Sequence, residues 1–251
     1  MIRLHYFPGN ASLAPHIVLH ETGAPFELQR VDREHGEHKS PAYLKLNPNG
    51  LIPVLEDGAL VLYEAAAICL HLADTHPAAA LAPALGTAER AQFYKWLIWM
   101  TNTLQATLMH YFSPERLVDE GNAEGAAQVK AHAQARVGAL LEQLDAQFAS
   151  HGGPWLLGAA YSAADAYAFM LCRWTRGFPD RPARDYPHLA PFLERMLARP
   201  AVSARSRPRS CSSRSSDLRR RSIAGEGFVA ARGPRRAFAG SAELRVRDAA
   251  A

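Results

Sequence analysis

The apolar periodicity of the chain changes near residue 78, and this change limits the folds open to it. Before that point, strand-type and helix-type segments alternate. A strand at "RLHYF" is followed by a helix from Ser12 to Thr22, which Gly23 ends, and by a second strand at "FELQRVD". After a short helical segment around "PAYLKL", the run "IPVLEDGALVLYE" predicts a hairpin around Asp57-Gly58, and "AAAICLHLADTH" predicts a helix.

This order predicts a mixed sheet of four strands, because the first strand pair needs a crossover and the last pair needs only a tight turn. Prolines and small residues in "PAAALAPALG" indicate a linker. Beyond it, residues 87–118 and 123–149 have apolar side chains at helix spacing. Ser162 begins a third helix, with Asp165 placed to complete a capping box. We therefore expect an α/β domain over 1–78, a linker over 79–86 and an all-helical domain over 87–202.

The segment 203–251 differs in composition from the rest of the chain. It carries twelve arginines, no lysine and four acidic residues, whereas the first 202 residues have a net charge of −4. Without apolar periodicity it cannot bury enough surface to offset its ordering entropy, so we expect disorder. It is either a basic arm for nucleic acid or an accidental C-terminus, such as a shifted reading frame. The abrupt change after "MLARPAV" favours the second interpretation.

The cysteines and histidines give further expectations. Cys69, Cys172 and Cys211 are widely spaced and form no CxxC pair, which favours a reducing compartment. No signal-peptide pattern and no apolar run of about 20 residues is present, so we expect a cytoplasmic protein without a membrane segment. His16 and His20 share one helix face, but no third ligand is evident, and we expect no metal site.

Four segments in a fixed order carry a resemblance to a known family: "YFPGNASLAPH", "HKSPAYLKLNPNGLIPVLEDG", "LVLYEAAAICLHLAD" and "LLGAAYSAADAYAF". Over residues 1 to about 202 the chain resembles the cytosolic glutathione S-transferases, and most of all bacterial members of beta-class or phi-like type. The resemblance implies a thioredoxin-like N-terminal domain, an all-helical C-terminal domain and a homodimer. It also implies an enzyme that activates the thiol of glutathione, its co-substrate, for attack on a hydrophobic electrophile, a peroxide or a disulfide.

By the same resemblance, several residues contact glutathione. The Ile52 backbone, before a proline that is cis in the family, Pro53, pairs with the cysteinyl unit as an added strand would. Glu64 contacts the γ-glutamyl amine, and the helix N-terminus at Ala65 receives the glutamyl carboxylate.

Two further positions match a family pair that contacts the glycyl carboxylate, namely His38 and Lys39. The family usually has serine where this chain has Ala65 and often glutamine where it has Leu51. Both departures remove side-chain hydrogen bonds to the tripeptide, which predicts weaker binding of glutathione.

Three residues near the end of the first strand are candidates for holding the thiolate. Ala11 occupies the position of the beta-class cysteine, which is "PGACSLAPH" in that class and "PGNASLAPH" here. We rank Asn10 first, because its amide can donate to sulfur without ionising. Ser12 ranks second, with the alternative that it is only a helix N-cap, and Tyr6 third, with the alternative that it is a strand aromatic with a solvated hydroxyl.

Aromatic side chains in the first long helical segment are the last candidates. Residues at helix spacing usually belong to the core, yet the resemblance implies that some face a cleft and bind a hydrophobic co-substrate. The candidates are Trp96, Trp99 and Tyr111. Two other functions stay open: a non-catalytic ligand carrier or regulatory protein with the same fold, and a nucleic-acid binder that uses the tail.

Overall fold

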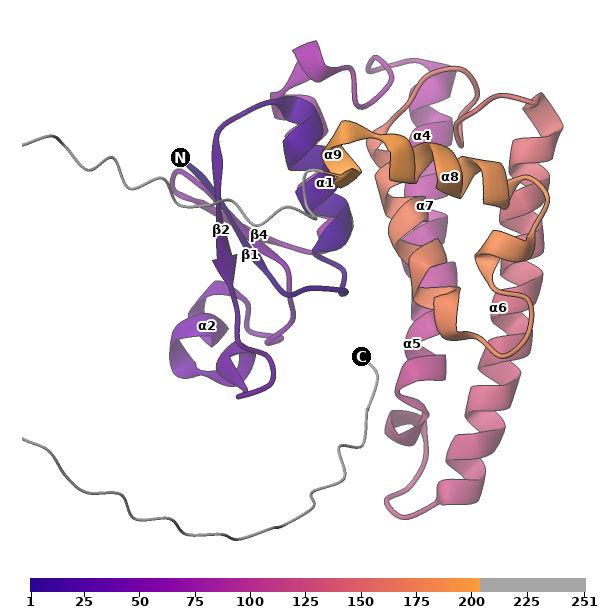
Figure 1. Ribbon diagram of the computed structural model, residues 1–251. Helices are drawn as coiled ribbons and strands as arrows, with labels where there is room; N and C mark the ends of the chain where they lie inside the picture. Colours follow the sequence, from indigo (N-terminus) through magenta and orange to yellow (C-terminus); the bar gives the residue numbers. More distant parts are fainter. Residues whose placement is uncertain (204–251) are drawn as a thin grey trace, which may run out of the picture. The chain divides into compact units, whose positions relative to one another are not determined.

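The computed structural model describes residues 1–203, which lie within one compact unit. The predicted tail therefore lies outside the described residues, apart from Ser203. Four strands form one sheet in the order β2-β1-β3-β4 (Figure 1): β1 (Ile2–Tyr6), β2 (Phe26–Arg30), β3 (Val54–Asp57) and β4 (Leu60–Tyr63). β1 is parallel to β2 and antiparallel to β3, and β3 is antiparallel to β4. The predicted four-stranded mixed sheet is confirmed.

The helices of the sheet-containing part are α1 (Leu13–Thr22), η1 (Glu37–Lys39), α2 (Pro41–Leu46), α3 (Ala65–Thr75) and η2 (Pro77–Ala79). As predicted, α1 ends at Gly23, whose φ of 69° is in the left-handed region that glycine tolerates. The hairpin turn lies one residue later than predicted. Asp57 pairs with Leu60, so Gly58 and Ala59 form the two-residue loop, and Gly58 supplies positive φ at the first loop position.

The helical part begins with α4 (Ala88–Trp99), the π-helix η3 (Met100–Gln105) and α5 (Ala106–Phe112). It continues with η4 (Pro114–Leu117), α6 (Ala123–His151), α7 (Ala163–Trp174), η5 (Thr175–Gly177), η6 (Ala183–Asp185), α8 (Leu189–Ala198) and α9 (Pro200–Ser203). The helical segment predicted over 87–118 is continuous from Ala88 to Phe112 with a π-turn inside it, but it ends at Phe112, before the separate 3-10 helix η4. Among residues 1–203, no helix is both long and apolar enough to pass through a bilayer.

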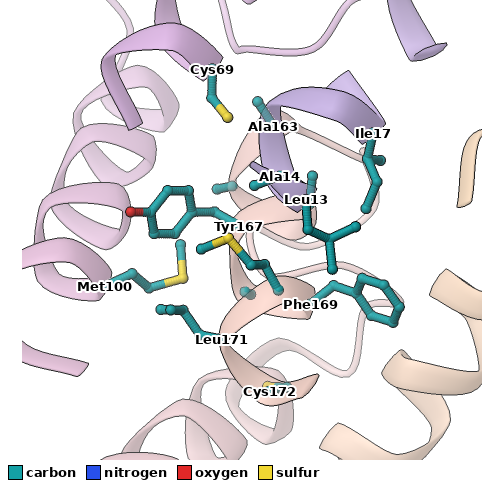
Figure 2. Packing of buried hydrophobic residues seen from close by; sticks show 14 of the residues in the cluster. Leu13, Ala14, Ile17, Cys69, Met100, Ala163, Tyr167, Phe169, Leu171 and Cys172 are labelled. Atoms are coloured by element: carbon teal, nitrogen blue, oxygen red, sulfur yellow. The ribbon is translucent and has the colours of Figure 1, made fainter. Parts of the chain in front are cut away.

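The largest core cluster joins α1 and α7 (Figure 2). Ala14 and Ile17 of α1 are fully buried, as are Ala163 and Leu171 of α7, and Phe169 is 1% exposed. α7 is apolar on nearly every side, so it is buried only if other elements surround it. α1, α3, α4 and α8 all pack against it. Through α1, the sheet-containing part shares this core with the helical part.

A second connection links the start of the chain to its last described helix. Arg199, just before α9, donates two hydrogen bonds to the Glu21 carboxylate of α1, at 2.6 and 2.9 Å. The guanidinium also lies 3.7 Å from the centre of the Tyr161 ring. Two parallel hydrogen bonds and a stacked ring hold arginine in one geometry. The pair therefore fixes α9 against α1.

The capping box predicted at the start of α7 is present. Asp165 is fully buried and accepts hydrogen bonds from the Ser162 backbone N–H at 2.8 Å and the Ser162 hydroxyl at 3.1 Å. It also accepts from the Leu156 backbone N–H at 2.7 Å, a contact that the sequence does not indicate. Burial raises the pKa of Asp165 to about 6. Asp165 thus anchors the loop before α7 as well as the helix.

We predict that Asp165→Ala destabilises the protein much more than Ser162→Ala does. The first change leaves three buried donors without an acceptor, which should cost about 2–4 kcal/mol of unfolding free energy. The second removes one hydroxyl and should cost about 1 kcal/mol. Urea unfolding of both variants at one protein concentration measures the difference. Equal losses would mean that the two backbone contacts of Asp165, with Leu156 and with Ser162, contribute nothing.

Candidate functional site

The register of the sheet brings three of the predicted site residues, Tyr6, Pro53 and Glu64, to one end of it. His5 pairs with Val54 on β3, so the next residue, Tyr6, lies beside Pro53. Val54 also pairs with Tyr63 on β4, so Pro53 lies beside Glu64. Neighbouring strands are about 4.8 Å apart, and these three residues therefore stand side by side. β2 ends at the same edge, because Arg30 pairs with Tyr6, and the loop to His38 and Lys39 starts there.

The turn after β1 is held by hydrogen bonds among Phe7, Asn10 and Ser12. The Asn10 side-chain oxygen accepts from the Ser12 backbone N–H at 2.9 Å and lies 2.7 Å from the Ser12 hydroxyl. The Ser12 hydroxyl also accepts from the Phe7 N–H at 3.3 Å and lies 3.0 Å from the Phe7 carbonyl. Within residues 1–203, the Asn10 amide nitrogen has no hydrogen-bond partner. The Ser12 N–H and hydroxyl therefore orient the Asn10 side chain, and the N–H groups of its amide stay available to donate to a ligand.

These contacts separate the three thiolate candidates. Ser12 is 3% exposed, and its single hydroxyl proton already has two acceptors within reach. The alternative that its side chain caps α1 is wrong: Ser12 is the N-cap residue, but its side chain makes no capping hydrogen bond. Tyr6 is half-buried, with its ring centre 5.9 Å from that of His16. His16 and His20, the predicted pair, stack at 5.0 Å.

The loop before β3 holds the Ile52 backbone in place. The Leu51 carbonyl accepts from the Tyr43 hydroxyl at 3.0 Å and from the Asn47 side-chain amide at 2.9 Å. The Ile52-Pro53 bond is cis, as the resemblance implied. In the part of the chain that the structure describes, neither the N–H nor the C=O of Ile52 has a hydrogen-bond partner. Nothing in the sequence indicated Tyr43 and Asn47, because their partner is a backbone carbonyl.

His38 and Lys39 form part of η1 and contact the same loop. The Lys39 ammonium donates to the Asn49 carbonyl at 3.1 Å. Gly50, with φ of 60°, lies so close that an added Cβ would be 2.8 Å from the Lys39 nitrogen and the His38 carbonyl. Burial, together with the charges of Lys39 and Arg33, lowers the pKa of His38. These surroundings therefore disfavour the charged form of His38.

Glu64 occupies the N-cap position of α3 in an unusual backbone conformation. Its φ is 72°, which non-glycine residues rarely adopt and which costs free energy. Its backbone carbonyl accepts from Ile68 at 2.9 Å, while its exposed carboxylate has no partner among residues 1–203. Ala65, 5% exposed, begins the helix, and the N–H groups of its first turn have no partner within the helix. A carboxylate thus stands beside a helix end that attracts anions.

The three aromatic candidates lie in different surroundings. Trp96 is 5% exposed and belongs to the core, so it has little surface to offer a co-substrate. Trp99 is half-buried, with its ring centre 5.2 Å from that of Trp96. Tyr111 is half-buried on α5, with its ring centre 4.2 Å from that of Phe178. Trp99 and Tyr111 keep exposed surface that Trp96 lacks.

Known proteins share this architecture. Residues 11–75 match the family model for the N-terminal domain of glutathione S-transferases, and residues 99–200 match the model for the C-terminal domain. Glutathione S-transferase GST-4.5 of Xanthomonas campestris pv. campestris is 34% identical over 208 residues, which cover 81% of this chain and 96% of that protein.

Two solved structures, both with bound glutathione, are also similar. A glutathione transferase homologue from Sulfitobacter superposes with a TM-score of 0.75 at 28% identity, covering 82% of this chain and 97% of that one. A sphingomonad glutathione S-transferase superposes with a TM-score of 0.68 at 33% identity, covering 80% of this chain and 96% of that one. Because both family models match and the similarity extends over nearly the full length of these relatives, this chain belongs to the glutathione S-transferase family.

Proposed function

We propose that the protein binds glutathione where β1, β3 and β4 meet and activates its thiol for nucleophilic attack. The observation that carries this proposal is the register that sets Tyr6, Pro53 and Glu64 side by side. The unpaired Ile52 backbone can take the cysteinyl unit as an added strand. Glu64 and the N-terminus of α3 suit the glutamyl amine and carboxylate, while Lys39 suits the glycyl carboxylate.

To activate glutathione, the site must stabilise the thiolate form of its thiol. A free thiol has a pKa of about 8.5, and lowering it by two units takes about 2.7 kcal/mol of preferential stabilisation. One hydrogen bond to the charged sulfur, added to the positive end of α1, is of this size. The thiol proton leaves to water. The thiolate then forms a bond to an electrophilic carbon, whose leaving group departs with the bonding electrons. Alternatively, it attacks a peroxide oxygen and releases an alkoxide as the O–O bond breaks, or it attacks a disulfide and releases a thiolate as the S–S bond breaks.

Asn10 is the group that we propose holds the thiolate, with Ser12 as the residue that positions it. The Asn10 oxygen is bound by Ser12, which leaves the amide N–H groups free to donate to sulfur. Ala11 offers no thiol, so mixed-disulfide chemistry through that position is absent. We place the protein near the beta-class or phi-like transferases, because "PGNASLAPH" differs from the beta-class "PGACSLAPH" only at positions 10 and 11. Cys69 and Cys172 are buried and free, in keeping with a reducing, cytoplasmic setting.

The substitution Asn10→Ala should raise the pKa of bound glutathione by about one unit and lower turnover at neutral pH about tenfold, because one hydrogen bond to the thiolate is lost. Ser12→Ala should raise the pKa by less, and the double variant should match Asn10→Ala, because Ser12 acts through Asn10. Thiolate absorbance titrated with pH measures all three. Thr87→Ala, which removes a cap on α4, is the control. An unchanged pKa in Asn10→Ala with a raised one in Ser12→Ala would reverse the assignment.

For glutathione affinity, Glu64→Gln should weaken binding about tenfold, because a carboxylate that pairs with the glutamyl ammonium is lost. Glu89→Gln, in the first turn of α4, is the matched control and should leave affinity unchanged. Calorimetric titration of each protein with glutathione provides the measurement. If the unaltered protein binds no glutathione, the proposed function is wrong. If it binds glutathione but turns over no halogenated aromatic, hydroperoxide or mixed disulfide, it is instead a carrier.

We also propose that the protein is a homodimer. β4 is an edge strand, and its Leu60 and Val61 side chains are 42% and 41% exposed. Ile98 on α4 is 57% exposed. An edge strand with exposed apolar side chains can pair with another chain, and exposed apolar surface of this kind marks sites of association. Sedimentation at micromolar concentration should therefore show a dimer that Val61→Asp shifts toward monomer. Monomer alone in the unaltered protein would contradict the proposal.

A further inference from the structure

The π-helix η3 interrupts one long helical stretch at a position that sequence periodicity did not reveal. A π-turn holds one residue more than an α-turn, so the helix that follows is rotated by about 100° relative to an uninterrupted α-helix. Short π segments of this kind occur often at functional sites. Here the segment separates α4 from α5, and α5 carries Tyr111 and Phe112.

Side-chain hydrogen bonds mark both ends of this segment and join it to α7. The Thr101 hydroxyl donates to the Ile98 carbonyl at 2.8 Å, and the Thr107 hydroxyl donates to the Thr103 carbonyl at 2.7 Å. At its last residue, the Gln105 side-chain oxygen accepts from the hydroxyl of Tyr167 on α7. Figure 2 shows the Tyr167 hydroxyl directed toward the helix that carries Met100.

The bond between Tyr167 and Gln105 depends on the π-turn. Tyr167 is 1% exposed, so its hydroxyl needs a partner inside the protein. In an uninterrupted α-helix Gln105 would be turned about 100° away, and the hydroxyl would be left unpaired in the core. The π-turn and this hydrogen bond therefore support each other.

The rotation decides which side chains of α5 face the rest of the helical part. Leu108 is fully buried, Tyr111 packs on Phe178, and the ring centre of Phe112 lies 6.2 Å from that of Trp174 at the end of α7. Phe112 is 40% exposed. The π-turn thus presents a set of aromatic rings that keeps exposed surface, formed by Tyr111, Phe112 and Trp174. Phe112, the most exposed of the three, offers a ring on which a flat aromatic group can stack.

We propose that Tyr167 and Gln105 are positioning residues that fix the rotation of α5 and so determine selectivity for aromatic electrophiles. This inference rests on the proposed glutathione-dependent function. Neither residue needs to touch the co-substrate. Their hydrogen bond holds the π-turn, and the π-turn sets the direction in which Tyr111 and Phe112 face.

The test compares Tyr167→Phe, Gln105→Met and the double variant with the unaltered protein. In each, KM for chlorodinitrobenzene should rise about threefold to tenfold, as loss of a buried hydrogen bond implies, while the Kd for glutathione stays within about twofold. The double variant should recover most of the urea midpoint, because no buried polar group is left unpaired, yet keep the raised KM. Tyr186→Phe, which removes a buried hydroxyl bonded to the Gly138 carbonyl, should change neither constant.

Three outcomes overturn the inference. If both single variants lose stability but keep KM for chlorodinitrobenzene, the hydrogen bond is structural only. If KM returns to its original value together with stability in the double variant, the rotation of α5 does not set selectivity. If the unaltered protein binds no glutathione, both the proposed function and the inference are wrong. If it binds glutathione and turns over normally, and the variants have an unchanged KM, only the inference is wrong.

Discussion

The pairing of β1 with β3 is the constraint on which the site depends. β1 is hydrogen-bonded on both sides, to β2 and to β3, so it cannot slip by one residue without moving Leu4 out of the core. The same pairing sets Tyr6 beside Pro53, and through β3 it sets Pro53 beside Glu64. The packing of a buried leucine thus decides where three loops meet. The side chains at those loops add chemistry to a place that the backbone has already defined.

Local patterns predicted most of the fold, because each rests on residues close together in the chain. The stop of α1 at Gly23, the capping box of Ser162 and Asp165 and the mixed sheet all follow from short segments. The hairpin was predicted one residue early, since Asp57 favours turns but here ends a strand. The candidate site residues came from resemblance to a family, and the register, which no single segment contains, sets three of them, Tyr6, Pro53 and Glu64, side by side.

Other features could not be predicted because their partners lie far away in sequence. The Ser12 hydroxyl bonds backward to Phe7 instead of capping the helix, and Tyr43 and Asn47 bind a carbonyl of a later loop. The π-helix was not predicted either, because apolar residues keep helix spacing through residues 87–118. In the structure, the buried positions from Met100 to Phe112 are Met100, Leu104 and Leu108, each four residues apart, where an α-helix would alternate between three and four. The constant spacing fits a wider turn.

The bond between Glu21 and Arg199 has a consequence for how the protein unfolds. The two residues are 178 positions apart, and they join helices at opposite ends of the described chain. With α1 also packed on α7, the sheet-containing part cannot open while the helical part stays intact unless this contact breaks and apolar surface is exposed. The first helix and the last helix of residues 1–203 are thus held together by non-covalent contacts. We therefore expect cooperative melting as a single unit, although its architecture has two parts.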